Sequence, residues 1–535
     1  MQESTAVLIV GAGPTGLMAA CQLARLGIKF RIIDKNKEPT TQSRALAIHA
    51  ASMEIFSQMG ISDEFIALGK QTKAINYLVK GKVTEHIPLS AFGKGLTAFP
   101  FLLMLEQSRT ERLLVNFLEK QGYEVEWETE LIAFTQDTNA VYVTVKHNER
   151  NEETIKASWL IGADGAKSIV RRILNIPFGG ETYPINLFVL DCKVNWQLQD
   201  DEIYIAFSNY SFAGFFPMPE NRCRIIGFVP KDIGEKENIS FEDIKKGFAE
   251  RMQMKVELSD PKWISMYHSH HRYVSQFRTG RCFLAGDAAH IHSPVGAQGM
   301  NTGLQDANNI AWKLALVIRN QAKENLLATY QQERLPFARQ LVKTTDNAFG
   351  ITVSKNPFIK IMRMYVAPKI LALILKVNFI TRYIFKNISQ IGMNYPDSLL
   401  SKNASYGSFV SKAPKPGERL PYLAFKDASG KTFGMQQKVN GLTLHLFIFS
   451  GSDNKINVHL LSNIAQRFKE AITIEYISLI SGNEILYKSL GIKRTGCYLI
   501  RPDFHIAYRS IGFNEKHFEN YLNAILSNCR IQTQP

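Results

Sequence analysis

The chain has 535 residues and a formal net charge of +15, with 45% hydrophobic and 21% charged residues. This length predicts more than one domain, and the composition is that of a globular protein rather than a disordered or fibrous one. Its six cysteines are scattered and form no Cys-x-x-Cys pair, which argues against a zinc ribbon, a dithiol redox centre or a secreted disulfide scaffold.

No signal peptide and no run of eighteen uncharged apolar residues is visible, so we expect a cytoplasmic protein without a transmembrane helix. Seven basic residues lie between Lys355 and Lys386, and no acidic residue lies between Asp346 and Asp397. Two interpretations stay open for this apolar, basic segment: a core helix with a solvated basic face, or a peripheral membrane contact. We expect no nucleic-acid partner, because no recognition motif accompanies the charge.

The N-terminal residues predict a βαβ nucleotide-binding unit. An apolar strand, Ala6 to Val10, runs into Gly-Ala-Gly-Pro-Thr-Gly, a helix follows to about Leu26, and a second strand ends at Asp34. Gly11 would make the tight turn, Gly13 would admit a pyrophosphate, and Gly16 would allow close helix packing. Asp34 lies 23 residues after Gly11, where a carboxylate takes the ribose hydroxyls. The predicted cofactor-binding residues are Gly11, Gly13, Pro14, Thr15, Gly16, Asp34 and Lys35. The motif alone does not distinguish FAD from NAD.

Two sheets are predicted next. Alternating residues from Tyr123 to Ile161, with polar turns, predict a β-meander that ends in Gly162-Ala163-Asp164-Gly165. A second sheet is predicted from four strands: Asn186–Val194, Glu202–Phe207, Phe212–Met218 and Cys223–Val229. Its aromatic residues include Tyr204, Tyr210, Phe215 and Phe216. A period of two does not decide whether Phe215 or Phe216 faces a ligand, and most of these side chains are expected to be core.

The stretch from Arg281 to Leu314 predicts a buried strand, a glycine-rich loop and a helix that begins near Asn301. A helix N-terminus exposes backbone N–H groups and favours partial negative charge, such as the N1–C2=O edge of a reduced flavin. Asp287 is a strand-end carboxylate able to accept a hydrogen bond from a sugar-like hydroxyl.

The sequence Gly286-Asp287-Ala288-Ala289-His290, with Pro294 and Gly299-Met300-Asn301, resembles the second FAD motif of the single-component flavoprotein monooxygenases related to phenol hydroxylase. The resemblance implies that Asp287 holds the ribityl chain and that Pro294 and the helix N-terminus border the flavin ring. It also implies cofactor contacts for Arg44, Gln107 and Asp164, and for Gly286, Gly299, Met300 and Asn301. Phe215, Phe216 and Pro217 would then belong to the floor of the substrate pocket.

The resemblance implies an α/β fold with α+β character in the substrate region. A Rossmann-like FAD-binding domain (1–180 and 276–345) would carry an inserted substrate-binding β-sheet domain (181–275), followed by a helical segment (346–412). Residues 413–535 resemble the thioredoxin-like C-terminal domain of the phenol-hydroxylase branch, without its Cys-x-x-Cys pair, so a packing or homodimer role is expected there. Relatives commonly have Gly after Pro502-Asp503, where this chain has Phe504.

The implied activity is that of an FAD-dependent monooxygenase. NADPH or NADH would reduce FAD, O₂ would add at flavin C4a, and the hydroperoxide would hydroxylate a phenolic or polyaromatic substrate. A single Gly-x-Gly-x-x-Gly unit favours transient binding of the nicotinamide nucleotide, and no metal is expected. No catalytic base is assigned; Pro294, Tyr204 and Tyr210 are the candidate catalytic residues. Three alternatives stay open: Baeyer–Villiger or epoxidising chemistry, a flavin-binding protein without oxygenation, and a membrane-associated enzyme acting on a quinone precursor.

Overall fold

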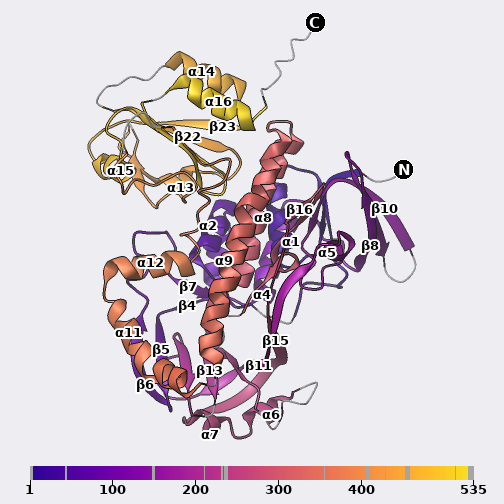
Figure 1. Cartoon of the computed structure of the whole chain (residues 1–535), viewed down its shortest axis with the longest axis vertical. Coiled ribbons are helices and arrows are strands. Elements are labelled where there is room, and N and C mark those ends of the chain that lie inside the picture. Colours follow the sequence, from indigo (N-terminus) through magenta and orange to yellow (C-terminus); the bar gives the residue numbers. More distant parts are fainter. Residues whose placement is uncertain are drawn as a thin grey trace.

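The computed structural model describes residues 4–41, 45–147, 151–209, 211–230, 233, 239–293, 295–354, 356–404, 409–427, 429–451, 458–512 and 514–527. Figure 1 shows three regions along the long axis: a central nucleotide-binding region, a second sheet beyond one end of it, and a C-terminal sheet with its helices beyond the other. Arg44, Tyr210 and Pro294 lie outside the described residues.

A seven-stranded sheet forms the central region. Its main path has the order β16-β17-β10-β1-β2, and β8 and β9 extend it as an antiparallel meander. β1, β2, β10 and β17 run parallel to one another. The strands are β1 (Ser4–Val10), β2 (Phe30–Ile33), β8 (Thr129–Gln136), β9 (Val141–His147), β10 (Asn151–Gly162), β16 (Arg278–Thr279) and β17 (Cys282–Leu284). The predicted meander is present, but its first strand begins at Thr129, because Glu128 has a left-handed backbone (φ 52°) that interrupts the extended run before it.

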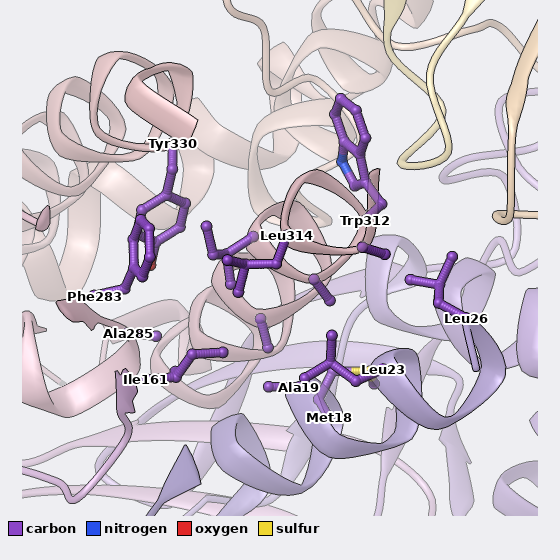
Figure 2. Packing of buried hydrophobic residues seen from close by; sticks show 14 of the residues in the cluster. Met18, Ala19, Leu23, Leu26, Ile161, Phe283, Ala285, Trp312, Leu314 and Tyr330 are labelled. Carbon is purple, nitrogen blue, oxygen red and sulfur yellow. The ribbon is translucent and has the colours of Figure 1, made fainter. Parts of the chain in front are cut away.

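Helices cover this sheet and enclose its core. α1 (Pro14–Arg25) packs between the sheet, α4 (Gln107–Lys120) and α8 (Gly299–Ile318). α8 is buried along almost its whole length, because apolar and small residues occupy most sides of the helix. In Figure 2, Met18, Ala19 and Leu23 of α1 lie close to Ile161 of β10, below the α8 turn that carries Leu314. The remaining elements here are β3 (Ala47–Ile48), α2 (Ala50–Met59), α3 (Ser62–Leu68), β4 (Lys70–Thr72), β7 (Leu102–Met104) and α5 (Ile169–Ile173).

An eight-stranded sheet has the order β18-β15-β11-β14-β13-β12-β5-β6. Its strands are β5 (Ala74–Val79), β6 (Lys82–Pro88), β11 (Phe178–Asn195), β12 (Ile203–Phe207), β13 (Phe212–Met218), β14 (Arg222–Phe228), β15 (Glu257–Val274) and β18 (His290–Ile291). α6 (Phe241–Lys245) and α7 (Phe248–Met252) cover one face. The four strands predicted from the sequence are present. β5 and β6 come from far earlier in the chain, and period-2 patterning alone could not have joined them to the other strands.

Helices lead from α8 toward the C-terminal region: α9 (Ala328–Val353), α10 (Pro357–Ile361), a π-helical turn at Met362–Val366, α11 (Ala367–Ile374) and α12 (Asn378–Ile388). Three short 3-10 turns lie at Gly286–Ala288, Val295–Ala297 and Glu324–Leu327. Within the described residues, none of the helices combines the length and the hydropathy needed to cross a bilayer.

The C-terminal region is a five-stranded sheet of order β19-β25-β24-β22-β23. β22 and β23 are parallel, whereas β24 is antiparallel to both β22 and β25. The elements are β19 (Lys402–Asn403), β20 (Ala424–Lys426), β21 (Thr432–Gly434), α13 (Met435–Lys438), β22 (Leu444–Phe449), α14 (Val458–Arg467), β23 (Ile472–Ile477), α15 (Glu484–Leu490), β24 (Gly496–Ile500), β25 (Ile506–Ile511) and α16 (Glu515–Ile525).

The turn between β24 and β25 keeps a glycine-like conformation without glycine. Phe504 adopts φ 66° and is buried, and the Arg419 guanidinium lies 4.8 Å from its ring centroid. A left-handed backbone costs a non-glycine residue about 1–2 kcal/mol. Burial of a phenylalanine side chain offsets a cost of that size.

Candidate functional site

Three loops meet at the carboxyl edge of the central sheet. In the parallel register, Val10 of β1 is opposite Gly162 of β10, and Gly162 is opposite Leu284 of β17. The loops that follow these strands therefore begin side by side, although they are separated by more than a hundred residues in sequence. In open α/β sheets, ligands bind at this edge.

The first loop contains two glycines that tolerate no side chain. A Cβ on Gly11 (φ 102°) would lie 2.4 Å from the carbonyl oxygen of Ala163, and one on Gly16 would lie 1.8 Å from the carbonyl oxygen of Gly11. Gly13 differs, because a Cβ there would meet no atom within 4 Å. The open side of the loop is therefore at Gly13, at the start of α1.

The start of α1 suits a phosphate. Pro14 occupies its first turn, no acidic residue lies there, and no side chain caps its N–H groups. Such an N-terminus favours an anion. The Asp34 carboxylate accepts hydrogen bonds from the backbone N–H of Ala12 (2.7 Å) and of Asn36 (2.8 Å), so it is held beside the glycine loop. Lys35 is exposed next to it.

Thr15 joins the first loop to the third. A Cβ on Gly286 would lie 2.4 Å from the Thr15 hydroxyl oxygen, and one on Gly303 of α8 would lie 2.2 Å from it. The hydroxyl thus fits between two glycines from the distant motif. This close approach brings α1 against α8 and explains why glycine is needed at both positions.

The loop before α8 is fastened through Asn301. The Asn301 side-chain oxygen accepts hydrogen bonds from the His49 backbone N–H (2.9 Å) and the Ser52 hydroxyl (2.8 Å), and its amide donates to the carbonyls of Ala47 (2.9 Å) and Ala297 (3.1 Å). All hydrogen-bonding positions of the buried amide are used. Asn301 therefore fixes the loop against residues 47–52, and Gly299 and Met300 stand at the adjacent helix start.

His49 supports the same loop. Its Nε2 lies 2.9 Å from the Gly296 carbonyl oxygen, so the ring donates a proton there. Burial lowers the pKa of His49 to about 4.

Asp306 of α8 anchors the loop that contains Gly286. Its carboxylate accepts hydrogen bonds from the Gly286 N–H (3.0 Å), from His290 Nε2 (2.7 Å) and from Arg334 Nε (2.6 Å). Burial alone would raise the pKa of Asp306, but Arg334 and His290 hold it below its ordinary value. Asp306 is thus a charged support beneath the loop, while Asp287 of the same loop is exposed.

Asp164 caps its own helix. Its carboxylate accepts hydrogen bonds from the Ser168 hydroxyl (2.5 Å) and from the N–H groups of Ile169 (2.6 Å) and Val170 (3.1 Å) at the start of α5. Burial raises its pKa above the ordinary value. Asp164 therefore shapes the loop that approaches Gly11 through Ala163.

Gln107, the first residue of α4, lies beside the segment that follows Arg44. Its side-chain oxygen accepts a hydrogen bond from the Ala45 N–H (3.2 Å), and its amide donates to Glu111 (2.9 Å). The Glu111 carboxylate also accepts from the Thr40 N–H (2.9 Å). Burial raises the pKa of Glu111 to about 7.

The two faces of the eight-stranded sheet separate the predicted substrate residues. Phe215 is fully buried in the cluster that includes Phe248 of α7, and Pro217 shares its side of β13. Tyr204 belongs to the same cluster and donates to Glu202 (3.1 Å). Phe216 points the other way, where it packs with Met218 and with Ala297 of the glycine-rich loop before α8.

The Phe216 side of the sheet carries two apolar clusters that share Ile205. One includes Ala297, Leu46 and Met104 from the nucleotide-binding region. The other includes Met364 of the helical segment, together with Val79 and Phe207. Gly214 makes room for the Phe216 ring, because a Cβ there would lie 2.9 Å from a ring carbon.

The sequence analysis missed the residues that support the site. Arg224 and Asp191 form a buried bidentate ion pair (both contacts 2.7 Å) on the Phe216 side of the sheet, and Arg224 also donates to the Ala45 carbonyl (3.2 Å). Charged residues at inward positions of apolar strands were the available signal. His49, Asp306 and Glu111 gave none, because their partners are distant in sequence. Among the described residues, no group of three or more potential metal ligands comes together.

The fold and the convergence of the three loops define a dinucleotide-binding site, and comparisons with known proteins identify the class of enzyme. Residues 4–345 match the family model described as "FAD binding domain", and the chain belongs to this family. It is 30% identical over 516 residues to a 6-methylpretetramide 4-monooxygenase from Streptomyces rimosus, covering 94% of this chain and 90% of that protein. It is 36% identical over 346 residues to a pentachlorophenol 4-monooxygenase from Sphingobium chlorophenolicum, covering 64% of this chain and 63% of that protein. Among solved structures, the OxyS anhydrotetracycline hydroxylase from Streptomyces rimosus aligns with a TM-score of 0.77 at 26% identity, over 97% of this chain and 98% of that chain.

The protein is an FAD-dependent monooxygenase, and the described residues fit the cofactor. The open side of Gly13, the uncapped start of α1 and the oriented Asp34 carboxylate match a pyrophosphate and a ribose.

Proposed function

We propose that this protein hydroxylates the phenolic ring of a polycyclic aromatic substrate, with NAD(P)H as electron donor and O₂ as oxidant. The observation that carries the proposal is the pair of apolar clusters on the Phe216 side of the sheet, which share Ile205 and include Ala297 in one cluster and Met364 in the other. A flat apolar molecule buried against such a surface gains about 25 cal/mol per Å² of apolar area.

The similarity to relatives supports a substrate larger than a single ring. The match to the 6-methylpretetramide monooxygenase spans 94% of this chain, so it includes the second sheet and the helical segment. The match to the pentachlorophenol monooxygenase spans 64%. We therefore favour a polycyclic substrate over a simple phenol.

The bound FAD supplies hydride acceptance and oxygen activation. The protein binds and orients the cofactor and the substrate, and it excludes water from them. Gly13 and the start of α1 would hold the pyrophosphate, Asp34 the ribose, and Asp287 the ribityl hydroxyls. Met300 and the helix start at Gly299 would border the flavin ring. Phe216 would position the aromatic substrate against the loop that contains Ala297, so that a small displacement of the ring carries a large cost in rate.

Arg44 and Pro294 remain predicted cofactor contacts. Asp164 and Asn301 would act indirectly, because their side chains are engaged in holding the loops. We assign no catalytic role to Tyr204, since it lies on the face covered by α6 and α7.

We also propose a division into an FAD-binding domain (1–180 and 276–345), a substrate domain (181–275), a helical segment (346–412) and a thioredoxin-like domain (413–535). The order β25-β24-β22-β23, with a β-α-β unit followed by a β-β-α unit, supports the thioredoxin-like assignment. The domain has no Cys-x-x-Cys pair, and Cys497 is buried and free, so a packing role is favoured.

The test is NADPH and NADH oxidation in air by the FAD-loaded protein, with polycyclic phenols and single-ring phenols as substrates. We expect a polycyclic phenol to stimulate oxidation and to yield a product heavier by one oxygen, with the new hydroxyl on a ring carbon. A ring-expanded ester would identify Baeyer–Villiger chemistry instead. Oxidation unaffected by any aromatic compound would contradict the proposal.

A pair of variants tests the assignment of the sheet faces. Phe216→Ala should raise KM for the substrate while FAD content stays unchanged, because it removes the floor and not the cofactor loops. Tyr204→Phe should leave kcat and KM unchanged, because it removes only a hydroxyl on the opposite face. A large loss of kcat in Tyr204→Phe with an unaffected Phe216→Ala would reverse the assignment.

A further inference from the structure

The helices α10, α11 and α12 lie along one side of the molecule (Figure 1). They expose large apolar side chains. Phe379 of α12 is 79% exposed, Phe358 of α10 is 70% exposed and Leu373 of α11 is 66% exposed. Ile361, Tyr365, Ile370, Val377, Tyr383 and Ile388 are also exposed within these 31 positions, 358–388. Single exposed apolar side chains are ordinary, but a concentration of this kind marks an interaction surface.

Basic residues are interspersed with the apolar ones. Lys369, Lys376, Arg382 and Lys386 are exposed, and no acidic residue occurs between Asp346 and Asp397. Lys369, Lys376 and Lys386 form no ion pair with any other residue that the structure describes. On α12, Phe379, Arg382, Tyr383 and Lys386 follow helical spacing and share one face.

The opposite side of the segment is fixed to the protein. Met364 packs with Val79 and Phe207 of the substrate sheet. The Phe385 ring lies where a Cβ on Gly93 would be 2.3 Å away. Arg382, although exposed, also donates to the Lys94 carbonyl (3.2 Å). The exposed side chains therefore project from a docked segment, which presents them as a surface.

We propose that this surface, residues 358–388, binds peripherally to a bilayer that contains anionic lipid. Apolar side chains surrounded by lysines, without acids, suit the boundary between acyl chains and negatively charged headgroups. Met364 of the same segment packs on the sheet that we assign to the substrate. A bilayer bound to the segment would therefore lie next to the helices that pack on that sheet. The proposal does not depend on the identity of the substrate.

Charge argues against a second copy of the chain as the occupant. A twofold interface places the same patch on both partners. Two copies meeting here would bring eight exposed basic side chains together without a carboxylate from the segment, and like charges across an interface are unfavourable.

The test is co-sedimentation of the FAD-loaded full chain with vesicles of phosphatidylcholine alone or with 30% phosphatidylglycerol added. We expect the protein to sediment with the anionic vesicles only, and less so in 0.5 M salt, because screening weakens the electrostatic part. Protein that stays in the supernatant with both kinds of vesicle would overturn the proposal.

Two variants separate the contributions. Lys369→Gln/Lys376→Gln should weaken binding to anionic vesicles roughly thirtyfold, since each lysine near an anionic surface strengthens binding about fivefold. Leu373→Ser/Phe379→Ser should abolish sedimentation. The matched control is Ile485→Ser/Lys488→Gln on α15, where Ile485 is 76% exposed and Lys488 is exposed, and we expect it to bind like the unchanged protein.

Far-UV circular dichroism and bound-flavin absorbance establish that each variant is folded and loaded. Equal losses in the segment variants and the α15 control would overturn the proposal, because they would show adsorption without a defined site. A dimer detected by analytical ultracentrifugation that dissociates in Leu373→Ser/Phe379→Ser would also overturn it, because a second copy would then cover the surface.

Discussion

Glu333 of α9 is the charged centre of the junction between the nucleotide-binding region and the C-terminal sheet. Its carboxylate accepts two hydrogen bonds from Arg501 (2.7 and 2.8 Å) and one from Lys313 (2.8 Å). Asn309 (2.8 Å) and Ser398 (2.6 Å) also donate to it. Because the carboxylate is fully buried, we predict that Glu333→Gln destabilises this junction by about 3–5 kcal/mol, the cost of removing one partner from a buried ion pair.

The effect should be local enough to measure by hydrogen exchange. If exchange in β24, β25 and α8 occurs through opening of the junction, a loss of about 3–5 kcal/mol accelerates it roughly 10²- to 10³-fold or more, since 1.4 kcal/mol is tenfold. Glu519→Gln is the matched control, because Glu519 also pairs with an arginine, Arg467, but about one third of each side chain is exposed. We expect at most about 1 kcal/mol there.

A double variant tests the charge argument itself. Lys313→Met/Glu333→Gln removes one charge of each sign and leaves Arg501 paired with Asp503, so exchange should slow relative to Glu333→Gln alone. Burial alone would raise the pKa of Glu333, but Arg501 and Lys313 hold it at about 2, below its ordinary 4.5. The carboxylate's stabilisation is therefore complete above about pH 5 and is lost as the pH falls toward 2. Exchange in Glu333→Gln within threefold of the unchanged protein at pH 7 would refute this account.

The cofactor loops give three further predictions. Gly13→Val should fold normally but bind no FAD, whereas Gly16→Val should fail to fold. The reason is that a Cβ at Gly13 has open space and a Cβ at Gly16 does not. A yellow Gly13→Val protein would contradict the loop assignment. Asn301→Leu should reduce FAD affinity at least tenfold, measured by flavin fluorescence. The start of α8 would lose three hydrogen bonds to residues 47–52 and one to Ala297, and unchanged affinity would contradict this fastening role. The pKa of His49 is lowered from 6.5 to about 4, so the unfolded chain binds a proton before the folded protein does as the pH falls. The free energy of unfolding should therefore drop by up to about 3 kcal/mol between pH 6.5 and 4. Urea titrations should show a smaller drop in His49→Gln.

The sequence predicted the elements whose signals are local. The turn at Gly11, the helix that begins at Pro14 and the strand that ends near Asp34 follow from glycine placement and apolar runs, and the structure has them within one or two residues. The FAD-dependent monooxygenase class followed from the resemblance of the second motif, and the family match confirms it.

What the sequence could not predict are contacts between distant segments. Period-2 alternation in β13 left Phe215 and Phe216 equivalent until the packing of α7 on one face distinguished them. Phe504 stands where relatives commonly have Gly, and it adopts a left-handed conformation, because tertiary burial offsets a local backbone preference. The supports of the loops, such as Asp306 beneath Gly286, depend on pairings that no local pattern encodes.

The buried charges show how α8 connects the site to the rest of the molecule. Asp306 near its start holds the loop at Gly286, and Lys313, two turns later on the same helix, joins the junction with the C-terminal sheet through Glu333. α9 carries both Arg334, which pairs with Asp306, and Glu333, which pairs with Lys313. Adjacent residues of α9 thus pair with two positions of α8 that lie two turns apart. We therefore expect a change at the C-terminal junction that shifts α9 relative to α8 to disturb the hydrogen bond from Gly286 to Asp306 as well.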